Sequence, residues 1–359
     1  MIYISPEQGN STGLHEVQSD THTMYTHHHQ SLATRRRRSI IIGVIGMIAG
    51  FFLVRLFFPT REAQPLPARH SEEATRWALQ GEHLLRAGLL PPDLQYARTD
   101  TVIIVPGHGV FRGLNAEEWA NENQWGLDPH FHEGSGLLIR AIAQHIKMGL
   151  QELKDDVDRS IVVFSGGQTK PGAGPRSEGL SYYLLMEATK LFGLFPVGSA
   201  QAQHVMTTRV FAEEYSRDSY ENLLFSVCRF KEVTGHYPSR IVVVGWEYKR
   251  RRFEDLHRVA LRWPKQRFRY IGVDIVDAAK QLGVLSVPDK LLHLSDDGTL
   301  ERTKSDLYLC RANRKTREER NPQRRVIPYY VSCPELRELL GHCGPELFDA
   351  SKLPWGDGP

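Results

Sequence analysis

The sequence has few cysteines, and none of them are spaced for metal binding. Four cysteines occur in 359 residues, and the absence of a Cys-x-x-Cys pair excludes the common structural zinc motifs. No segment repeats with a period of about 20–50 residues, which excludes solenoid and propeller architectures. With 41% apolar residues, the composition is typical of a globular protein rather than a disordered or collagen-like chain.

The sequence also lacks a broad excess of one charge. Its net charge of +3 combines four arginines at residues 35–38, a net +5 at residues 311–325, and −6 in the remainder of the chain. Nucleic-acid binding requires a basic stripe or face, so we expect no nucleic-acid partner. We expect the basic segment 311–325 to be a solvated loop; the alternative is a contact with anionic lipid headgroups. No metal site is expected.

One long apolar run, residues 39–58, stands out against this background. Twenty helical residues at ~1.5 Å each span ~30 Å, the thickness of a bilayer core. Arg55 is its only charge, and the run is apolar on every side, unlike an amphipathic core helix. A signal peptide rarely has 38 residues before its apolar region, and Glu7 and Glu16 are unlike a mitochondrial presequence. We therefore expect a single transmembrane helix that contacts membrane lipid.

The charges beside this run predict its orientation. Because the four arginines precede it directly, the positive-inside rule places residues 1–38, a polar tail, in the cytosol and the large domain across the membrane. A lumenal domain in the ER or Golgi follows, with the mitochondrial inner membrane as the alternative. In an oxidising lumen Cys333 and Cys343 can form a disulfide. We expect Cys228 to be a small core residue in a helix.

From residue 101 the sequence alternates between strand and helix patterns. Short β-branched runs predict strands, and apolar residues every three or four positions predict helices. The predicted strands are 101–105, 161–165, 206–211, 241–245 and 268–273, and the predicted helices are 135–153, 176–191, 218–233 and 250–261. This alternation predicts a doubly wound, mainly parallel α/β sheet of Rossmann-like type with helices on both faces.

The domain organisation follows from this pattern. A Pro-rich spacer with a helix, residues 59–100, separates the membrane run from the α/β domain at 101–275. Beyond residue 275 the pattern weakens, so we expect residues 276–359 to be an extension of peripheral helices that carries the basic segment.

Polar residues gather after the predicted strands. They are Gly107 and His108 after the first strand, Gly166, Gly167, Ser177 and Glu178 after the second, Glu214, Ser219, Glu221 and Asn222 after the third, and Lys249 and Arg252 after the fourth. Each has an ordinary structural interpretation, such as a tight turn, a helix cap or a solvated face. Because ligands bind at the carboxyl ends of the strands in such sheets, four loops of this kind predict a functional cleft.

The order of these motifs resembles the SanA/YdcF/ElyC-like family, the domain of unknown function 218. The motifs on which this resemblance rests are GHG, SGG, Ser-Glu, E-x-x-R-D-S-x-E-N, and an aromatic-Lys/His-x-x-Arg group after a strand. The resemblance covers residues 101–275. The longer stretches of sequence around these motifs are similar to a eukaryotic, fungal-like, membrane-anchored branch of the family. It implies a site of Gly166, Gly167, Ser177, Glu178, Glu214, Ser219, Glu221, Asn222 and Arg252. One departure is Lys249, where many members carry His, and a lysine acts as a base only if burial lowers its pKa.

These residues suggest chemistry on a phosphate. We expect the Gly166-Gly167 turn to offer free backbone N–H groups, and Lys249 and Arg252 to add positive charge. Glu178, Glu214, Glu221 and Lys249 are the candidate catalytic groups. The leading hypothesis is an enzyme acting on a phosphate-containing small molecule or lipid-linked precursor. The alternatives are a non-catalytic module that binds a nucleotide-like or glycan-precursor ligand, and a structural membrane protein. No cofactor is indicated.

Overall fold

A five-stranded parallel sheet forms the centre of the fold. The computed structural model describes residues 94–128, 131, 136–281, 283–284, 286–292 and 294–356. The strands are β1 (Thr101–Pro106), β4 (Ser160–Ser165), β5 (Val210–Glu213), β6 (Arg240–Trp246) and β7 (Phe268–Val273). Their order is β5-β4-β1-β6-β7, and every neighbouring pair is parallel. The chain thus winds outward from β1 in one direction and then in the other, so its topological switch point lies between β1 and β6.

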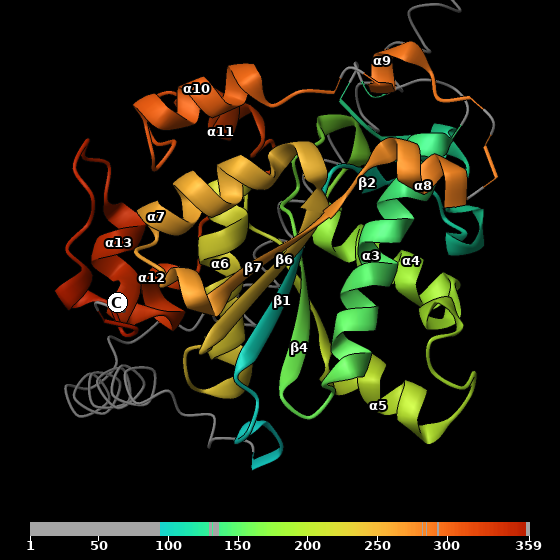
Figure 1. The fold of residues 1–359 in the computed structure, drawn as a ribbon, viewed down its shortest axis with the longest axis horizontal. Coiled ribbons are helices and arrows are strands. Elements are labelled where there is room, and N and C mark those ends of the chain that lie inside the picture. Colours follow the sequence, from blue (N-terminus) through green and yellow to red (C-terminus); the bar gives the residue numbers. More distant parts are fainter. Residues whose placement is uncertain are drawn as a thin grey trace, which may run out of the picture. The chain divides into compact units, whose positions relative to one another are not determined.

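Helices cover both faces of this sheet, as the alternating pattern predicts (Figure 1). One face is covered by α3 (Leu137–Asp155), α4 (Glu178–Ala188), α5 (Ala200–Thr208) and α8 (Ile275–Gln281), and the other by α6 (Ser219–Thr234), α7 (Arg258–Ala260), α12 (Tyr329–Ser332) and α13 (Arg337–Gly341). The remaining helices are α9 (Asp289–Leu292), α10 (Asp297–Ser305) and α11 (Arg314–Glu319), and β2 (Val110–Phe111) pairs with β3 (Trp125–Gly126) in a small antiparallel ribbon. The Rossmann-like α/β prediction is confirmed.

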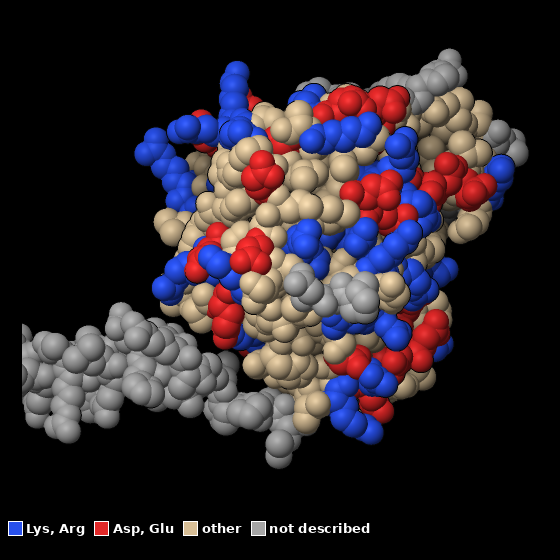
Figure 2. All heavy atoms as spheres, turned by 60° about the vertical axis from the view of Figure 1, so that its left-hand side comes forward, with Lys and Arg blue, Asp and Glu red and all other residues tan. Residues whose placement is uncertain are grey.

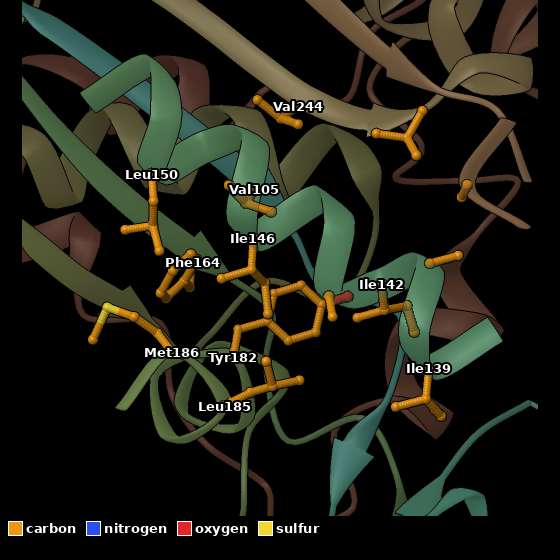
Figure 3. Close-up of a cluster of buried hydrophobic side chains, with 14 of the residues drawn as sticks. Val105, Ile139, Ile142, Ile146, Leu150, Phe164, Tyr182, Leu185, Met186 and Val244 are labelled. Atoms are coloured by element: carbon orange, nitrogen blue, oxygen red, sulfur yellow. The ribbon is translucent and has the colours of Figure 1, made fainter. Parts of the chain in front are cut away.

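Alternate residues of each strand supply two separate cores. In β1, Ile103 and Val105 pack under α3 and α4, whereas Val102 and Ile104 pack under α6. Figure 3 shows the first core, where α3 places one row of side chains, Ile139, Ile142, Ile146 and Leu150, toward the sheet. Burying each such side chain contributes about 1.5–3 kcal/mol, so these helices are held mainly by their apolar faces.

The predicted strand at residues 206–211 is wrong over its first half. Helix α5 extends to Thr208, and β5 begins only at Val210. The Ser199 side chain caps the helix by accepting from the Ala202 N–H at 3.0 Å. Ala202 and Val205 are both buried and share one face of the helix. The cap and this three-residue spacing outweigh the β-propensity of the threonines at its end.

The C-terminal extension forms part of the core, so its description as peripheral is wrong. Tyr308, Leu309, Tyr329 and Leu336 are buried in the second core, to which α6 also contributes. Helix α12 packs against α6. The extension therefore completes the domain.

The disulfide in this region is not the predicted one. Cys310 is bonded to Cys343, across 33 residues, while Cys333 is a buried free thiol whose sulfur lies 3.3 Å from the Tyr237 hydroxyl. The burial of Cys333 in the second core explains the difference, since its side chain is packed there among apolar residues. Cys228 is a buried residue of α6, as predicted.

The predictions for the N-terminal part lie outside the described residues. They comprise the tail 1–38, the transmembrane run 39–58 and the helix expected in 59–100 before residue 94. Among the described residues, no helix is long and apolar enough to span a bilayer.

Candidate functional site

A cavity of about 500 Å³ lies at the carboxyl ends of β1 and β6, and we call it the switch-point cavity. Its walls come from four strand-end loops and from the extension. The lining residues include Gly107, His108, Thr169, Glu178, Ser216, Asp218, Ser219, Asn222, Trp246, Lys249, Arg252, Asp296 and Arg320. Its volume and its place in the fold are typical of small-ligand sites in doubly wound proteins.

The structure brings seven of the twelve predicted site residues to this cavity and leaves five outside it. The seven are Gly107, His108, Glu178, Ser219, Asn222, Lys249 and Arg252, and the five are Gly166, Gly167, Ser177, Glu214 and Glu221. The motifs after the strands therefore converge on one place, but not every polar residue in them faces it.

Glu178 is the first residue of α4 and is held tightly at the cavity wall. The Thr169 hydroxyl donates to its Oε1 at 2.5 Å. A Cβ at Gly107 or Gly166 would lie 2.8 or 2.7 Å from its Oε2, so neither position has room for a side chain. These two glycines are required because they let the carboxylate approach two strand ends.

The expectation of free N–H groups at the Gly166-Gly167 turn is wrong. Gly166 N donates to the Glu213 carbonyl at 3.0 Å, and Gly167 N donates to the Ser216 carbonyl at 2.7 Å. Glu178 N, at the start of the helix, donates back to the Gly167 carbonyl at 3.0 Å. The donors of this turn are occupied within the protein, so the turn does not bind an anion in the cavity.

Ser177 and Glu214 form a structural contact beside the cavity. The Ser177 hydroxyl accepts from the Leu180 N–H at 2.9 Å, which caps α4, and donates to Glu214 Oε1 at 2.7 Å. Ser177 is completely buried. This pair fixes the start of the helix that carries Glu178.

Glu221 is enclosed by two arginines. Its carboxylate accepts two hydrogen bonds from the Arg217 side chain, at 2.9 and 2.5 Å, and lies 3.3 Å from Arg317 Nε. Its side chain is almost fully buried. Glu221 therefore neutralises two cations behind the cavity wall.

Glu213, which the sequence analysis missed, organises a hydrogen-bond network under the cavity. Its buried carboxylate accepts from the Ser165 hydroxyl at 2.7 Å and the Tyr329 hydroxyl at 3.1 Å. Burial raises the pKa of this carboxyl group, against the effect of those hydrogen bonds. Its position directly at the end of a strand, before the predicted Glu214, was the available signal.

The same network fixes the amide of Asn222. The Ser216 hydroxyl donates to Asn222 Oδ1 at 2.6 Å, and Ser165 Oγ lies 3.0 Å from the same oxygen. With Oδ1 accepting from Ser216, the amide N–H₂ is the group left for the cavity that Asn222 lines. Asn222 is thus a side-chain donor placed at the site.

Lys249 and His108 meet inside the cavity. The lysine Nζ lies 3.4 Å from His108 Nδ1. Burial and the neighbouring Arg252 lower the pKa of Lys249 to about 7, although Asp296 and Glu178 act in the opposite direction. Burial and the lysine together hold the pKa of His108 well below its usual value. No carboxylate lies within ion-pair distance of Lys249 among the described residues, so its charge near neutral pH is available to a ligand.

Several buried polar atoms around the cavity have no hydrogen-bond partner within the described part of the protein. They are His108 Nε2, Trp246 Nε1, Arg252 Nε, His257 Nδ1 and Asp296 Oδ2. Most buried polar atoms in proteins are hydrogen-bonded. Ordered water, an ion or a ligand can supply the partners that these atoms lack.

The basic segment builds one wall of the cavity, so its interpretation as a solvated loop is wrong in part. Arg317 Nε donates to Asp218 at 2.6 Å, and Arg320 donates to the Arg217 carbonyl at 3.1 Å. Arg325 lies 3.9 Å from the centre of the Tyr215 ring. On the face in Figure 2, basic and acidic side chains are interspersed. No motif in the sequence indicated that the extension would reach the site.

Comparison with known proteins gives one relative. The "Uncharacterized protein YOR238W" of Saccharomyces cerevisiae is 30% identical over 261 residues, which span 64% of this chain and 86% of the yeast protein. No family model matches the chain, so the comparison does not extend to the SanA/YdcF/ElyC-like family. No solved structure matches it.

Proposed function

This chain belongs to the same family as the uncharacterized protein YOR238W of Saccharomyces cerevisiae, and we propose that it is an enzyme that acts on a phosphate-containing small molecule or lipid-linked precursor. The name of the yeast protein describes no activity, so the proposal rests on the site. The reaction class is a hydrolysis or a transfer at the phosphate. The switch-point cavity is the proposed active site.

The observation that carries this proposal is the pairing of Glu178 and Lys249 as lining residues of one cavity. Neither has an ion-pair partner among the described residues. A lysine with a pKa of about 7 attracts an anion and gives up its proton near neutral pH, and a fixed carboxylate activates water or a hydroxyl group. Asn222 and Arg252 would add donors to the phosphate oxygens.

The resemblance to the SanA/YdcF/ElyC-like family supports the location of this site, because its motif residues supply most of the strand-end wall. Membrane attachment through residues 39–58 is part of the proposal, and it motivates the lipid-linked substrate. The Cys310–Cys343 disulfide supports a lumenal position of the domain, since such bonds persist in oxidising compartments.

The test is a turnover assay with the full-length chain purified in detergent. We expect hydrolysis within a panel of phosphate monoesters, diesters and pyrophosphates, and a loss of about 100-fold in Glu178→Gln. Glu187→Gln, an exposed change on the same helix, is the matched control. Equal rates in the wild type and Glu178→Gln would contradict the proposed role of this carboxylate.

A binding module remains the second candidate, because Glu214 and Glu221 are both engaged in structural contacts. Only Glu178 of the three predicted glutamates is then available for catalysis. Thermal-shift titration with the same panel separates the two functions. Saturable stabilisation by a phosphate compound without any turnover favours the binding module.

A further inference from the structure

Ser219 and His257 form a contact that the proposed reaction does not yet use. Ser219 opens α6 and lines the switch-point cavity. Its hydroxyl oxygen lies 2.8 Å from Nε2 of His257. The histidine is completely buried in a π-helical turn, η8 (Arg252–His257), and its other ring nitrogen, Nδ1, has no hydrogen-bond partner among the described residues.

The unpartnered nitrogen decides which ring atom carries the proton. A neutral imidazole has one N–H donor and one acceptor nitrogen. With the proton on Nδ1, a buried N–H would have no acceptor, which is the costlier arrangement in proteins. With the proton on Nε2, the ring donates to Ser219 Oγ and leaves only a bare lone pair on Nδ1. The second arrangement is therefore favoured.

This tautomer leaves the Ser219 hydroxyl hydrogen for the cavity. The N–H groups of Tyr220 and Glu221 are already used, because the Asp218 side chain accepts from them at 3.1 and 2.9 Å. The Ser219 hydroxyl is then a side-chain donor that the start of α6 can offer to a ligand. An anion would accept from it, whereas a cation would not.

A role for Ser219 as a nucleophile fits the surroundings less well. Burial, with Arg252 and Arg317 nearby, keeps the pKa of His257 well below its usual value, so the ring is a weak base. No carboxylate orients its Nδ1 among the described residues, in contrast to a serine-histidine-aspartate triad. The ring can position the serine but is poorly suited to take its proton.

We propose that His257 is a positioning residue that holds the Ser219 hydroxyl as a donor to a phosphate oxygen of the ligand. The proposal deepens the proposed function and rests on it. It predicts that Ser219 and His257 act as one unit in ligand binding. It also predicts that any N–H donor at the position of His257 Nε2 is sufficient to hold the Ser219 hydroxyl in place.

The test measures binding of inorganic phosphate at pH 6.5 to the full-length chain in detergent. Ser219→Ala should weaken binding about tenfold, the value of one hydrogen bond to a charged group. His257→Leu should do the same, and the double variant should lose no more. His257→Gln, whose side-chain amide places an N–H near the site of Nε2, should bind within about threefold of the wild type.

Three results would overturn the proposal. One is a loss in His257→Gln as large as in His257→Leu at an equal melting temperature. Another is additive loss in the double variant. The third is phosphorylation of Ser219, detected by mass spectrometry after incubation with p-nitrophenyl phosphate, which would make it a nucleophile.

A ligand-free measurement separates this inference from the proposed function. A wild type that binds no phosphate contradicts the proposed function. The ¹⁵N chemical shifts of the His257 ring, assigned by comparison with His257→Gln, report the tautomer in the absence of ligand. A proton on Nε2 supports the arrangement, and a proton on Nδ1 overturns it.

Discussion

Nζ of Lys249 lies 3.4 Å from Nδ1 of His108, and no carboxylate lies within ion-pair distance of the lysine among the described residues. Two basic groups thus share one cavity, and burial favours the neutral form of both. The lysine is consequently charged below a pH of about 7 and neutral above it. Its charge is the part of the site that responds to physiological pH.

The affinity for an anion should therefore fall as the pH rises through about 7. Sulfate is a suitable probe, because its own charge is constant over this range. We expect sulfate binding to the wild type to weaken between pH 6 and pH 8.5, as measured by calorimetry. Lys249→Arg should remove most of this dependence, since an arginine stays charged. The same pH profile in both proteins would show that another group controls binding.

Gly166→Ala should disturb Glu178 directly. The added Cβ would lie 2.7 Å from Oε2 of Glu178, and the backbone at the strand end fixes the direction of this Cβ. Such overpacking costs about 1–3 kcal/mol of the free energy of unfolding, and the displaced carboxylate should also reduce turnover. Gly172→Ala is the matched control, because a Cβ added there would meet no atom within 4 Å. Denaturant unfolding and the turnover assay check both effects, and a stable, active Gly166→Ala would contradict the close approach.

Glu221→Gln should destabilise the fold. The change removes a buried negative charge that Arg217 binds directly and that lies 3.3 Å from Arg317, so Arg217 loses its ion-pair partner while Arg317 keeps Asp218. Removing one partner of a buried ion pair costs about 3 kcal/mol or more. We expect a lower denaturant midpoint, with Glu187→Gln unchanged as the exposed control. An unchanged midpoint in Glu221→Gln would mean that the arginines are solvated.

Reduction of the disulfide should destabilise the fold. The Cys310–Cys343 bond closes a loop across 33 residues, and the chain-entropy model gives it about 4 kcal/mol of stabilisation. We expect dithiothreitol to lower the melting temperature of the wild type but not that of Cys310→Ser/Cys343→Ser. Calorimetry checks this prediction. A reductant effect that is equal in both proteins would point away from this bond.

The sheet could be predicted from the sequence because its strands are short, apolar and β-branched. Runs such as IIV at 103–105 and VVV at 242–244 have few other interpretations in a chain that alternates with amphipathic helices. The boundary at Thr208 failed because the helix continues from the Ser199 cap, a local signal that was overlooked, and because Val205 is buried, a tertiary effect. Local strand propensity does not register the burial.

The candidate site was predicted in its strand-end part only. Glu178, Lys249 and Asn222 follow strands, and the topology of the sheet brings such positions together. Asp296 and Arg320 come from an extension whose path depends on long-range contacts, such as the ion pair of Asp296 with Arg252, so no local pattern places them at the cavity. The disulfide partner of Cys343 could not be predicted either, because the spacing of cysteines in the sequence does not determine which of them pair.

The π-helical turn at Arg252–His257 sets the angle between the two residues at its ends. In an α-helix, residues five apart point to different sides, but i→i+5 hydrogen bonding stacks them on one side. Arg252 and His257 are both buried through this extra residue. A one-residue deletion here would spare the strands yet separate Arg252 at the cavity from His257 behind Ser219. The length of this turn therefore distinguishes two kinds of relative. Relatives with the same length can keep the site, whereas relatives with a shorter turn keep only the fold.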